Sequence, residues 1–366
     1  MKKNKNRNLF LGILAFAVLL LLFFVIVMFE NTQKEETVKI GFVMSGKKEE
    51  NGWNGMHYQG IKAACDEYEV ELLVKEDVQE FTGQCITAIR ELAEEGAGMI
   101  ILSSYGYSEE VKELVAQYPD IIFYVNSSEY HGANMTSYFA RMYQTRYLAG
   151  IIAGMKTKSG QIGYVAAMPN NEVNRGINAF ALGVKRVNDD AKVIVTFTGS
   201  WDNEQIEKEA AKKLVAEKQV DVLTYHQNKN YVIQAAEEVG VASIGFHDQF
   251  DGFSPLYLTS AVFNWQPIYK ELVREFMKGK GNVHPNYWLG IEKDAVALSE
   301  YSSEVTKEMQ VEVEKAKNEI LSGKNIFSGV IYDSEGNLRC DENEVISDEM
   351  LLEQFDWYVE GVEFYE

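Results

Sequence analysis

From Val38 onward, short apolar runs rich in Val and Ile alternate with longer amphipathic stretches, and this alternation restricts the fold more than any other feature. The apolar runs include "VKIGFVM", "GMIILSS", "QIGYVAAM" and "VDVLTYH". Between them lie helical patterns such as "TGQCITAIRELAEEG", which ends on Gly, and "NEQIEKEAAKKLVAEK", which begins with an Asn at the cap position. Repeated strand–helix–strand units of this kind predict an α/β fold with parallel sheets covered by helices.

The alternation is interrupted once, at residues 137–160, where "SYFARMYQTRYLAGIIAGMKTKSG" predicts a long apolar helix. Residues 38–150 are therefore expected to form lobe I and residues 151–265 to form lobe II, each with strands enough for one doubly wound sheet. Residues 266–366 contain two helical patterns and a hairpin pattern, "SGVIYDSEGNLRC", but too few strands for a third lobe. We expect this last segment to return and complete both lobes.

The N-terminus has the composition of a membrane anchor. Residues 1–8 carry four Lys or Arg and no acid, and Leu9–Phe29 are apolar apart from one Gly. That length matches the roughly 20 residues needed to cross a bilayer and exceeds the core of an ordinary cleaved signal. We expect a basic cytoplasmic tail, a transmembrane anchor at 9–29 and a linker at 30–37, with the remaining chain on the extracytoplasmic side of the cell membrane. A cleaved signal is the alternative.

Charge and cysteine content narrow the possible functions further. The formal net charge is −20 and no basic patch is evident, so the sequence argues against nucleic-acid binding. The three cysteines, Cys65, Cys85 and Cys340, lack metal-ligand spacing, and Cys65 and Cys85 fall within helical patterns, where a free Cys acts as a small buried hydrophobic residue. A disulfide between two of them stays open at this stage.

Polar and aromatic side chains gather at the ends of the predicted strands. In open parallel sheets, ligands bind beyond the carboxyl ends of the strands. Rings can stack on a flat, partly polar molecule while amides and carboxylates bind its edge. The candidate ligand-binding residues are Trp53, Asn54, Ser104, Tyr105, Asn126, Trp201, Gln227, His247, Asp248, Asn264 and Trp265.

Other interpretations of these residues exist. A Trp at a strand end can instead plug a corner of the sheet. His226 and His247 suit hydrogen-bonded structural roles better than a metal site. No G-x-S-x-G, H-E-x-x-H, P-loop, G-x-G-x-x-G or C-x-x-C motif occurs, so we expect no enzyme, no metal and no cofactor.

Several longer stretches resemble the basic membrane protein (BMP) family of receptors for ABC importers, which includes purine-nucleoside receptors. They include "SYFARMYQTRYLAGIIAG", "IGYVAAMPNNEVNRGINAFALG", "TGSWDN", "QAAEEVGVASIGFHDQF" and "LTSAVFNWQPIY". The resemblance covers nearly all of the chain from Val38. It implies a periplasmic-binding-protein type I fold, in which two lobes joined by three crossovers clasp a ligand.

The resemblance also implies roles for single residues. Trp53 matches the aromatic residue that stacks on the purine in the family's Asp-x-x-Phe-Asn loop, and Asn54 matches the Asn of that loop. Asp248 in "GFHDQ" matches the acid that binds ribose hydroxyls. Two family features are absent: the acid of the first loop at its usual spacing, and a Lys after "TS". A free base is therefore as plausible as a nucleoside.

Together these observations predict a membrane-tethered receptor that binds a purine base or nucleoside and delivers it to an ABC permease. The alternatives are a ligand sensor that works with a separate membrane partner, and a receptor for a sugar or another small polar solute.

Overall fold

The computed structural model describes residues 16, 18–22, 37–50, 52–127, 132–279 and 286–366. The chain divides into two units, Met1–Val38 and Lys39–Glu366. Of the expected anchor, only Phe16 and Val18–Leu22 are described, and they are helical; the basic tail and nearly all of the linker lie outside the described residues. Within the part that is described, no helix combines the length and apolar character needed to span a bilayer.

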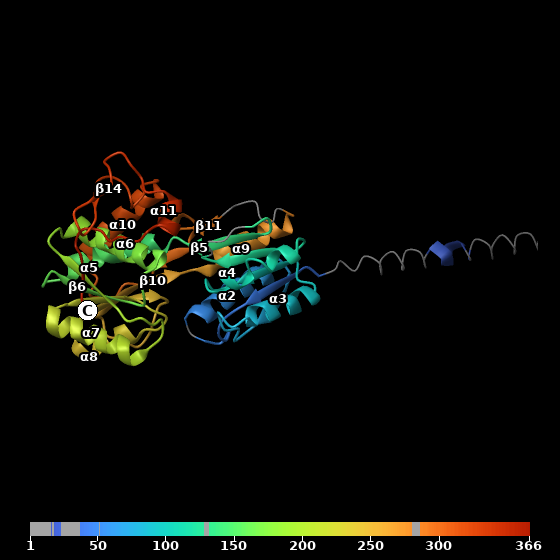
Figure 1. Cartoon of the computed structure of the whole chain (residues 1–366), viewed down its shortest axis with the longest axis horizontal. Helices are drawn as coiled ribbons and strands as arrows, with labels where there is room; N and C mark the ends of the chain where they lie inside the picture. Colours follow the sequence, from blue (N-terminus) through green and yellow to red (C-terminus); the bar gives the residue numbers. More distant parts are fainter. Residues whose placement is uncertain (1–15, 17, 23–36, 51, 128–131, 280–285) are drawn as a thin grey trace, which may run out of the picture. The chain divides into compact units, whose positions relative to one another are not determined.

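The described strands of the second unit begin with a parallel sheet of six, ordered β11-β5-β4-β3-β1-β2 and called the first sheet. Figure 1 shows β11 and β5 side by side. Its strands are β1 (Lys39–Val43), β2 (Glu71–Lys75), β3 (Met99–Leu102), β4 (Ile122–Asn126), β5 (Met135–Ala140) and β11 (Asn286–Leu289). The accompanying helices are α2 (Trp53–Glu67), α3 (Gln84–Glu94), α4 (Tyr107–Val111), the 3₁₀ turn η1 (Val115–Gln117) and α9 (Trp265–Met277). These elements make up the first lobe. β5 and β11 pair although they are far apart in the sequence.

A sheet of seven described strands follows, ordered β12-β10-β9-β8-β6-β7-β15 and called the second sheet. Its strands are β6 (Gln161–Ala166), β7 (Lys192–Phe197), β8 (Val222–His226), β9 (Ala242–His247), β10 (Tyr257–Phe263), β12 (Val296–Leu298) and β15 (Val362–Phe364). Its helices are α5 (Met142–Lys156), α6 (Asn171–Val187), α7 (Glu204–Lys218), α8 (Tyr231–Val239) and α10 (Lys307–Leu321). These elements make up the second lobe. All its strand pairs are parallel except β10 with β12.

Several local predictions are confirmed. Asn203 caps α7 by accepting a hydrogen bond from the Ile206 amide, and Gly96 follows α3 with a left-handed φ of 89°. The predicted hairpin is β13 (Ile331–Tyr332) paired antiparallel with β14 (Leu338–Cys340). Cys65, Cys85 and Cys340 are free and buried.

The helix predicted over 137–160 is wrong at its start. Met135–Ala140 form β5, which is buried along its whole length, and α5 begins only at Met142. A fully buried strand and a buried helix both appear as an uninterrupted apolar run, so periodicity could not separate them. α5 packs closely on α6, because a Cβ at Gly150 would lie only 2.0 Å from the Phe180 carbonyl oxygen.

The described chain passes between the two sheets at three places. Arg141 joins β5 to α5, Asn264 joins β10 to α9, and residues 290–295, with the 3₁₀ turn η2 (Ile291–Lys293), join β11 to β12. Backbone hydrogen bonds tie these crossings together, from Arg141 N to Leu289 O (2.7 Å) and from Asn264 N to Ala295 O (2.9 Å). The three crossings therefore lie side by side.

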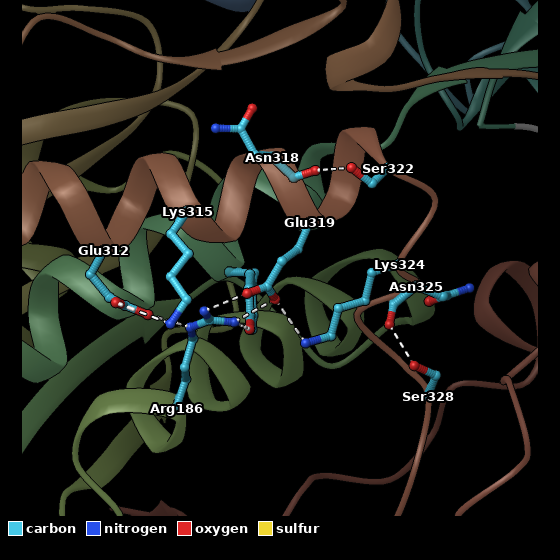
Figure 2. A network of polar contacts seen from close by, with 10 residues as sticks. Arg186, Glu312, Lys315, Asn318, Glu319, Ser322, Lys324, Asn325 and Ser328 are labelled. Carbon is cyan, nitrogen blue, oxygen red and sulfur yellow. Dashed lines mark hydrogen bonds and ion pairs between the residues drawn. The ribbon is translucent and has the colours of Figure 1, made fainter.

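An ion-pair network fastens α10 to α6 (Figure 2). The Arg186 guanidinium binds Glu319 through two hydrogen bonds of 2.8 and 2.9 Å, and its Nε donates to Glu312 at 2.8 Å. Lys324 reaches the same Glu319 carboxylate at 2.8 Å. These contacts hold the pKa of Glu319 at about 2, with the Arg186 hydrogen bond as the largest cause.

The C-terminal segment is bound by one polar face of α6. Asn174 and Asn178 donate side-chain hydrogen bonds to the backbone oxygens of Phe355 and Trp357, and Arg175 donates to that of Leu351. This segment includes α11 (Asp348–Glu353) and ends with β15 at the edge of the second sheet. Side chains three and four positions apart on α6 thus fix α11 and the backbone that follows it.

Candidate functional site

Trp53 lies where the two lobes meet. It is the first residue of α2 and follows Gly52, whose φ of 93° favours glycine. The indole Nε1 donates to the carbonyl oxygen of Ser103 at the end of β3, with an N–O distance of 3.1 Å. The Trp53 ring contacts His247 and Phe263 of the second lobe. The loop after β1 therefore places this tryptophan at the contact between the lobes.

An aromatic cluster, defined as Trp53, His57, His247, Phe263 and Trp265, forms around it. His57 and Trp265 are stacked with ring centroids 3.8 Å apart, and Phe263 and Trp265 with centroids 4.8 Å apart. The edge of Trp53 meets Trp265 at 5.3 Å and His247 at 5.8 Å. Trp53 and His57 come from α2, whereas His247 and Phe263 end strands of the second sheet. Rings from both lobes therefore converge.

A pocket of about 230 Å³ lies beside the aromatic cluster. Its lining residues are Glu50, Gly52, Met56, Gln59, Gly60, Asp248, Phe263, Asn264, Trp265 and Gln266. They come from the loop before α2, from α2 itself, from the end of β9 and from the crossing at Asn264. The pocket combines an aromatic wall with carboxylate and amide groups, which suits a small ligand with one apolar face and a polar edge.

The charges around the site are set by burial. Burial raises the pKa of the Asp248 carboxyl above 3.8, and neighbouring Asp251 raises it further, against the hydrogen bond from the Gln249 amide. Burial also lowers the pKa values of His57 and His247 well below 6.5, and each is lowered further by a nearby histidine, His247 for His57 and His226 for His247. Both imidazoles are therefore neutral at physiological pH.

Of the residues predicted from the strand ends, the structure brings Trp53, His247, Asp248, Asn264 and Trp265 to the aromatic cluster and the pocket. Their contact with a ligand stays a prediction.

Gln227 is buried next to the aromatic cluster, where its backbone oxygen accepts a hydrogen bond from His247 Nε2 at 2.7 Å. Trp201 packs against His226, with ring centroids 6.1 Å apart. Asn126 is buried at the end of β4. These three residues lie at strand ends, as the sequence predicted, but none of them lines the pocket.

Asn54, Ser104 and Tyr105 lie outside the aromatic cluster. The Asn54 amide bonds to Ser45 Oγ and to the Glu50 carboxylate, and the Ser104 hydroxyl donates to Glu80. Tyr105 is half exposed, on the loop after β3. Glu50 and Glu80 explain where Asn54 and Ser104 lie, because these carboxylates accept hydrogen bonds from the side chains that the sequence suggested would bind a ligand.

His57, Phe263 and Met56 were missed from the sequence. His57 is fully buried and stacks on Trp265, although it stands within a regular helix pattern. Its spacing from Trp53, four residues along α2, was the available signal because positions i and i+4 share a helix face. Across the described ranges, no three His, Cys, Asp or Glu side chains gather as metal ligands.

Two relatives are similar to this chain over 90% of its length. A purine-binding protein of Brucella abortus is 30% identical over 90% of this chain and 94% of its own length. A putative ABC transporter glucose-binding protein of Haloferax volcanii is 29% identical over 90% of this chain and 81% of its own length.

Solved structures support the fold. A transcriptional activator of the comK gene from Bacillus halodurans superposes with a TM-score of 0.69 at 24% identity, covering 78% of this chain and 99% of the other. An ABC transporter solute-binding protein from Conexibacter woesei superposes with a TM-score of 0.63 at 19% identity, covering 78% and 97%. The family model of PnrA-like ABC transporter substrate-binding proteins matches residues 37–334, so the chain belongs to this Bmp family.

Proposed function

We propose that the protein is the extracytoplasmic receptor of an ABC importer and that it binds a purine base or purine nucleoside between its two lobes. The observation that carries the proposal is the aromatic cluster, in which Trp53 of the first lobe touches His247 and Phe263 of the second. A planar heterocycle is the ligand that stacked rings bind best. The 30% identical relative is itself named a purine-binding protein.

The remaining parts of the proposal follow from this role. Residues 9–29 anchor the receptor in the cell membrane, and an ABC permease receives the ligand. The three adjacent crossings act as the hinge on which the lobes close. Asp248 lines the pocket and takes up hydroxyl or N–H groups of the ligand, together with Asn264.

A receptor for a sugar is the second candidate. Glu50, Gln59, Asp248 and Asn264 give the pocket several groups that bind hydroxyls, and one wall is a Trp ring. The Haloferax relative is named as a glucose-binding protein. A ligand sensor is the third candidate: a separate membrane partner would respond to the ligand-bound state of the protein. The protein resembles a transcriptional activator in fold.

A thermal-shift screen of purine bases, nucleosides and sugars tests the ligand class. A true ligand at 100 times its dissociation constant stabilises the fold by about 2.7 kcal/mol. We expect a purine to give this shift and sugars to give none. A shift with glucose and none with any purine would make the protein a sugar receptor.

Calorimetry on Trp53→Ala then tests the site. Loss of one stacked ring costs about 1 to 3 kcal/mol, so purine affinity should fall by roughly 5-fold to 150-fold. Tyr332→Ala is the control, because Tyr332 is an exposed ring on the β13–β14 hairpin. An unchanged affinity in Trp53→Ala would remove Trp53 from the site.

A further inference from the structure

Two buried histidines of the aromatic cluster each leave one ring nitrogen without a partner. His57 Nε2 and His247 Nδ1 have no hydrogen-bond partner among the residues that the structure describes. The His57 and His247 side chains are 0% and 5% exposed, so bulk water does not hydrogen-bond to these nitrogens. Because an unpaired buried polar atom is costly, such atoms at a binding site indicate where a ligand bonds.

A chain of hydroxyl groups bonds to Nδ1 of His57 and can place the imidazole proton on that nitrogen. The Tyr138 hydroxyl donates to the Leu102 carbonyl oxygen (3.3 Å) and lies 3.0 Å from the Tyr269 hydroxyl, which in turn bonds to His57 Nδ1. Each hydroxyl has one proton. If Tyr138 gives its proton to Leu102, Tyr269 donates to Tyr138, and His57 Nδ1–H donates to Tyr269. His57 Nε2 is then a bare acceptor.

His247 is fixed by a simpler contact. Its Nε2 lies 2.7 Å from the carbonyl oxygen of Gln227, which can only accept, so Nε2 carries the proton and Nδ1 is the bare acceptor. Since burial keeps both imidazoles neutral, neither bare nitrogen gains a proton of its own at neutral pH. Gln227 Oε1, also buried and without a partner among the described residues, adds a third acceptor.

Each histidine is held by its own lobe through one nitrogen, since the Tyr269 hydroxyl bonds to His57 Nδ1 and the Gln227 carbonyl oxygen bonds to His247 Nε2. In an imidazole ring the two nitrogens point in different directions, so the unpaired nitrogen of each ring is turned away from that partner. The Trp53 ring lies against both imidazoles, with centroid distances of 4.3 Å to His57 and 5.8 Å to His247. Trp53 is therefore in contact with both histidines.

We propose that His57 and His247 select the ligand by accepting hydrogen bonds from its N–H groups, so that the receptor prefers an amino-substituted heterocycle. This inference rests on the proposed purine-binding function and narrows it. Trp265 Nε1, a donor without a partner among the described residues, suits a ring nitrogen of the same ligand. A ligand that offered only acceptors would leave His57 and His247 unpaired.

Trp53 must change its position for this to happen. Stacked rings have centroids 4.5 to 7 Å apart, so a ligand ring between two side chains separates them by roughly twice that distance. Trp53 and Trp265 are only 5.3 Å apart, edge to face. The indole therefore turns or moves with its lobe when the ligand enters, and its Nε1 hydrogen bond to Ser103 is broken or remade.

The test compares two ligands of the same shape on the full-length protein. Adenine carries an amino group where 6-methylpurine carries a methyl group, and their ribosides form a second matched pair. Calorimetry gives the ratio of dissociation constants, and this ratio is independent of the fraction of active protein. We expect adenine or its riboside to bind at least about tenfold more tightly than the methyl analogue, because buried acceptors otherwise stay unpaired.

The variants His57→Phe and His247→Phe should each reduce this ratio at least about threefold, and the double variant should bring it close to one. Tyr332→Ala is the control, because Tyr332 is an exposed ring on the β13–β14 hairpin and its loss should leave the ratio unchanged. Thermal melts confirm that each variant is folded. A variant that does not fold is replaced by His57→Gln or His247→Asn, which are expected to lower the ratio because their amides can turn a donor toward the ligand.

The outcomes separate the two proposals. If the wild type binds both members of a pair equally, or if the histidine variants keep the wild-type ratio, the selective role of His57 and His247 is refuted and the purine receptor stands. If the wild type binds no purine, the proposed ligand class is refuted and the inference falls with it.

Discussion

Replacing Arg186 by Met should weaken the attachment of α10 to α6 by an amount that the ion-pair network predicts. Arg186 is the main reason why the pKa of Glu319 falls from 4.5 to about 2. At 1.4 kcal/mol for each pH unit, that fall corresponds to roughly 3 kcal/mol of stability. Lys324 causes part of that fall, and solvent screens a pair whose side chains are 15% and 30% exposed, so the expected loss is about 1 to 2 kcal/mol.

The pH dependence gives the sharper test. A carboxyl whose folded pKa is depressed stabilises the fold above its unfolded pKa of about 4.5, and the contribution is lost as the pH falls toward 2. Urea denaturation should therefore show Arg186→Met about 1 to 2 kcal/mol below the wild type at pH 7, with about two fifths of that difference at pH 3. Lys315→Met is the control, because Lys315 is 63% exposed and lies 3.8 Å from Glu312. Equal differences at both pH values would refute the electrostatic explanation.

Three further predictions concern stability, packing and the membrane. Burial raises the pKa of Glu207 to about 7, so its stabilisation is complete below pH 4.5 and is lost as the pH rises through 7. Measured in urea, the stability of the wild type relative to Glu207→Gln should therefore fall by about 2 to 3 kcal/mol between pH 5 and pH 8, and a constant difference would contradict this assignment. Gly60→Ala should cost about 1 to 3 kcal/mol and weaken purine binding, since its Cβ would stand 2.7 Å from Trp265 Cβ; an unchanged melting temperature would show that α2 and α9 have more room. The full-length chain should remain in the membrane fraction after a carbonate wash, and a chain lacking residues 1–36 should not; recovery of both in the wash would count against the anchor.

The architecture could be predicted from the sequence because the local sequence of most helices and strands agrees with their place in the fold. Runs such as "MIIL" in β3 are buried along their whole length, and such runs between amphipathic stretches have few alternatives to a parallel sheet. Caps such as Asn203 mark their helices by side-chain chemistry alone. The exception, β5, failed because the run that contains it continues into the buried helix α5, with only Arg141 between them.

The site was accessible only in part, because its contacts depend on partners from distant segments. Trp53, Asp248 and Trp265 could be placed at strand ends, and those ends meet in the fold. Glu80, which takes up the Ser104 hydroxyl, lies in the loop after β2, and no residue of that loop was among the candidates. The role of His57 depends on Tyr269 and Tyr138, which come from α9 and β5, so no local pattern could reveal its bare nitrogen.

The edge strands of the second sheet affect how readily the protein aggregates at high concentration. β15 and β12 are each only three residues long, and they stand at the outer positions of the seven described strands. Behind β15 lies β7, six residues with the apolar run "VIV", which would make a ready template for a foreign strand if it were bare. Because β15 of the C-terminal segment pairs with β7, little unpaired backbone is left for a strand of a neighbouring copy. Deletion of that segment should therefore increase aggregation of the protein.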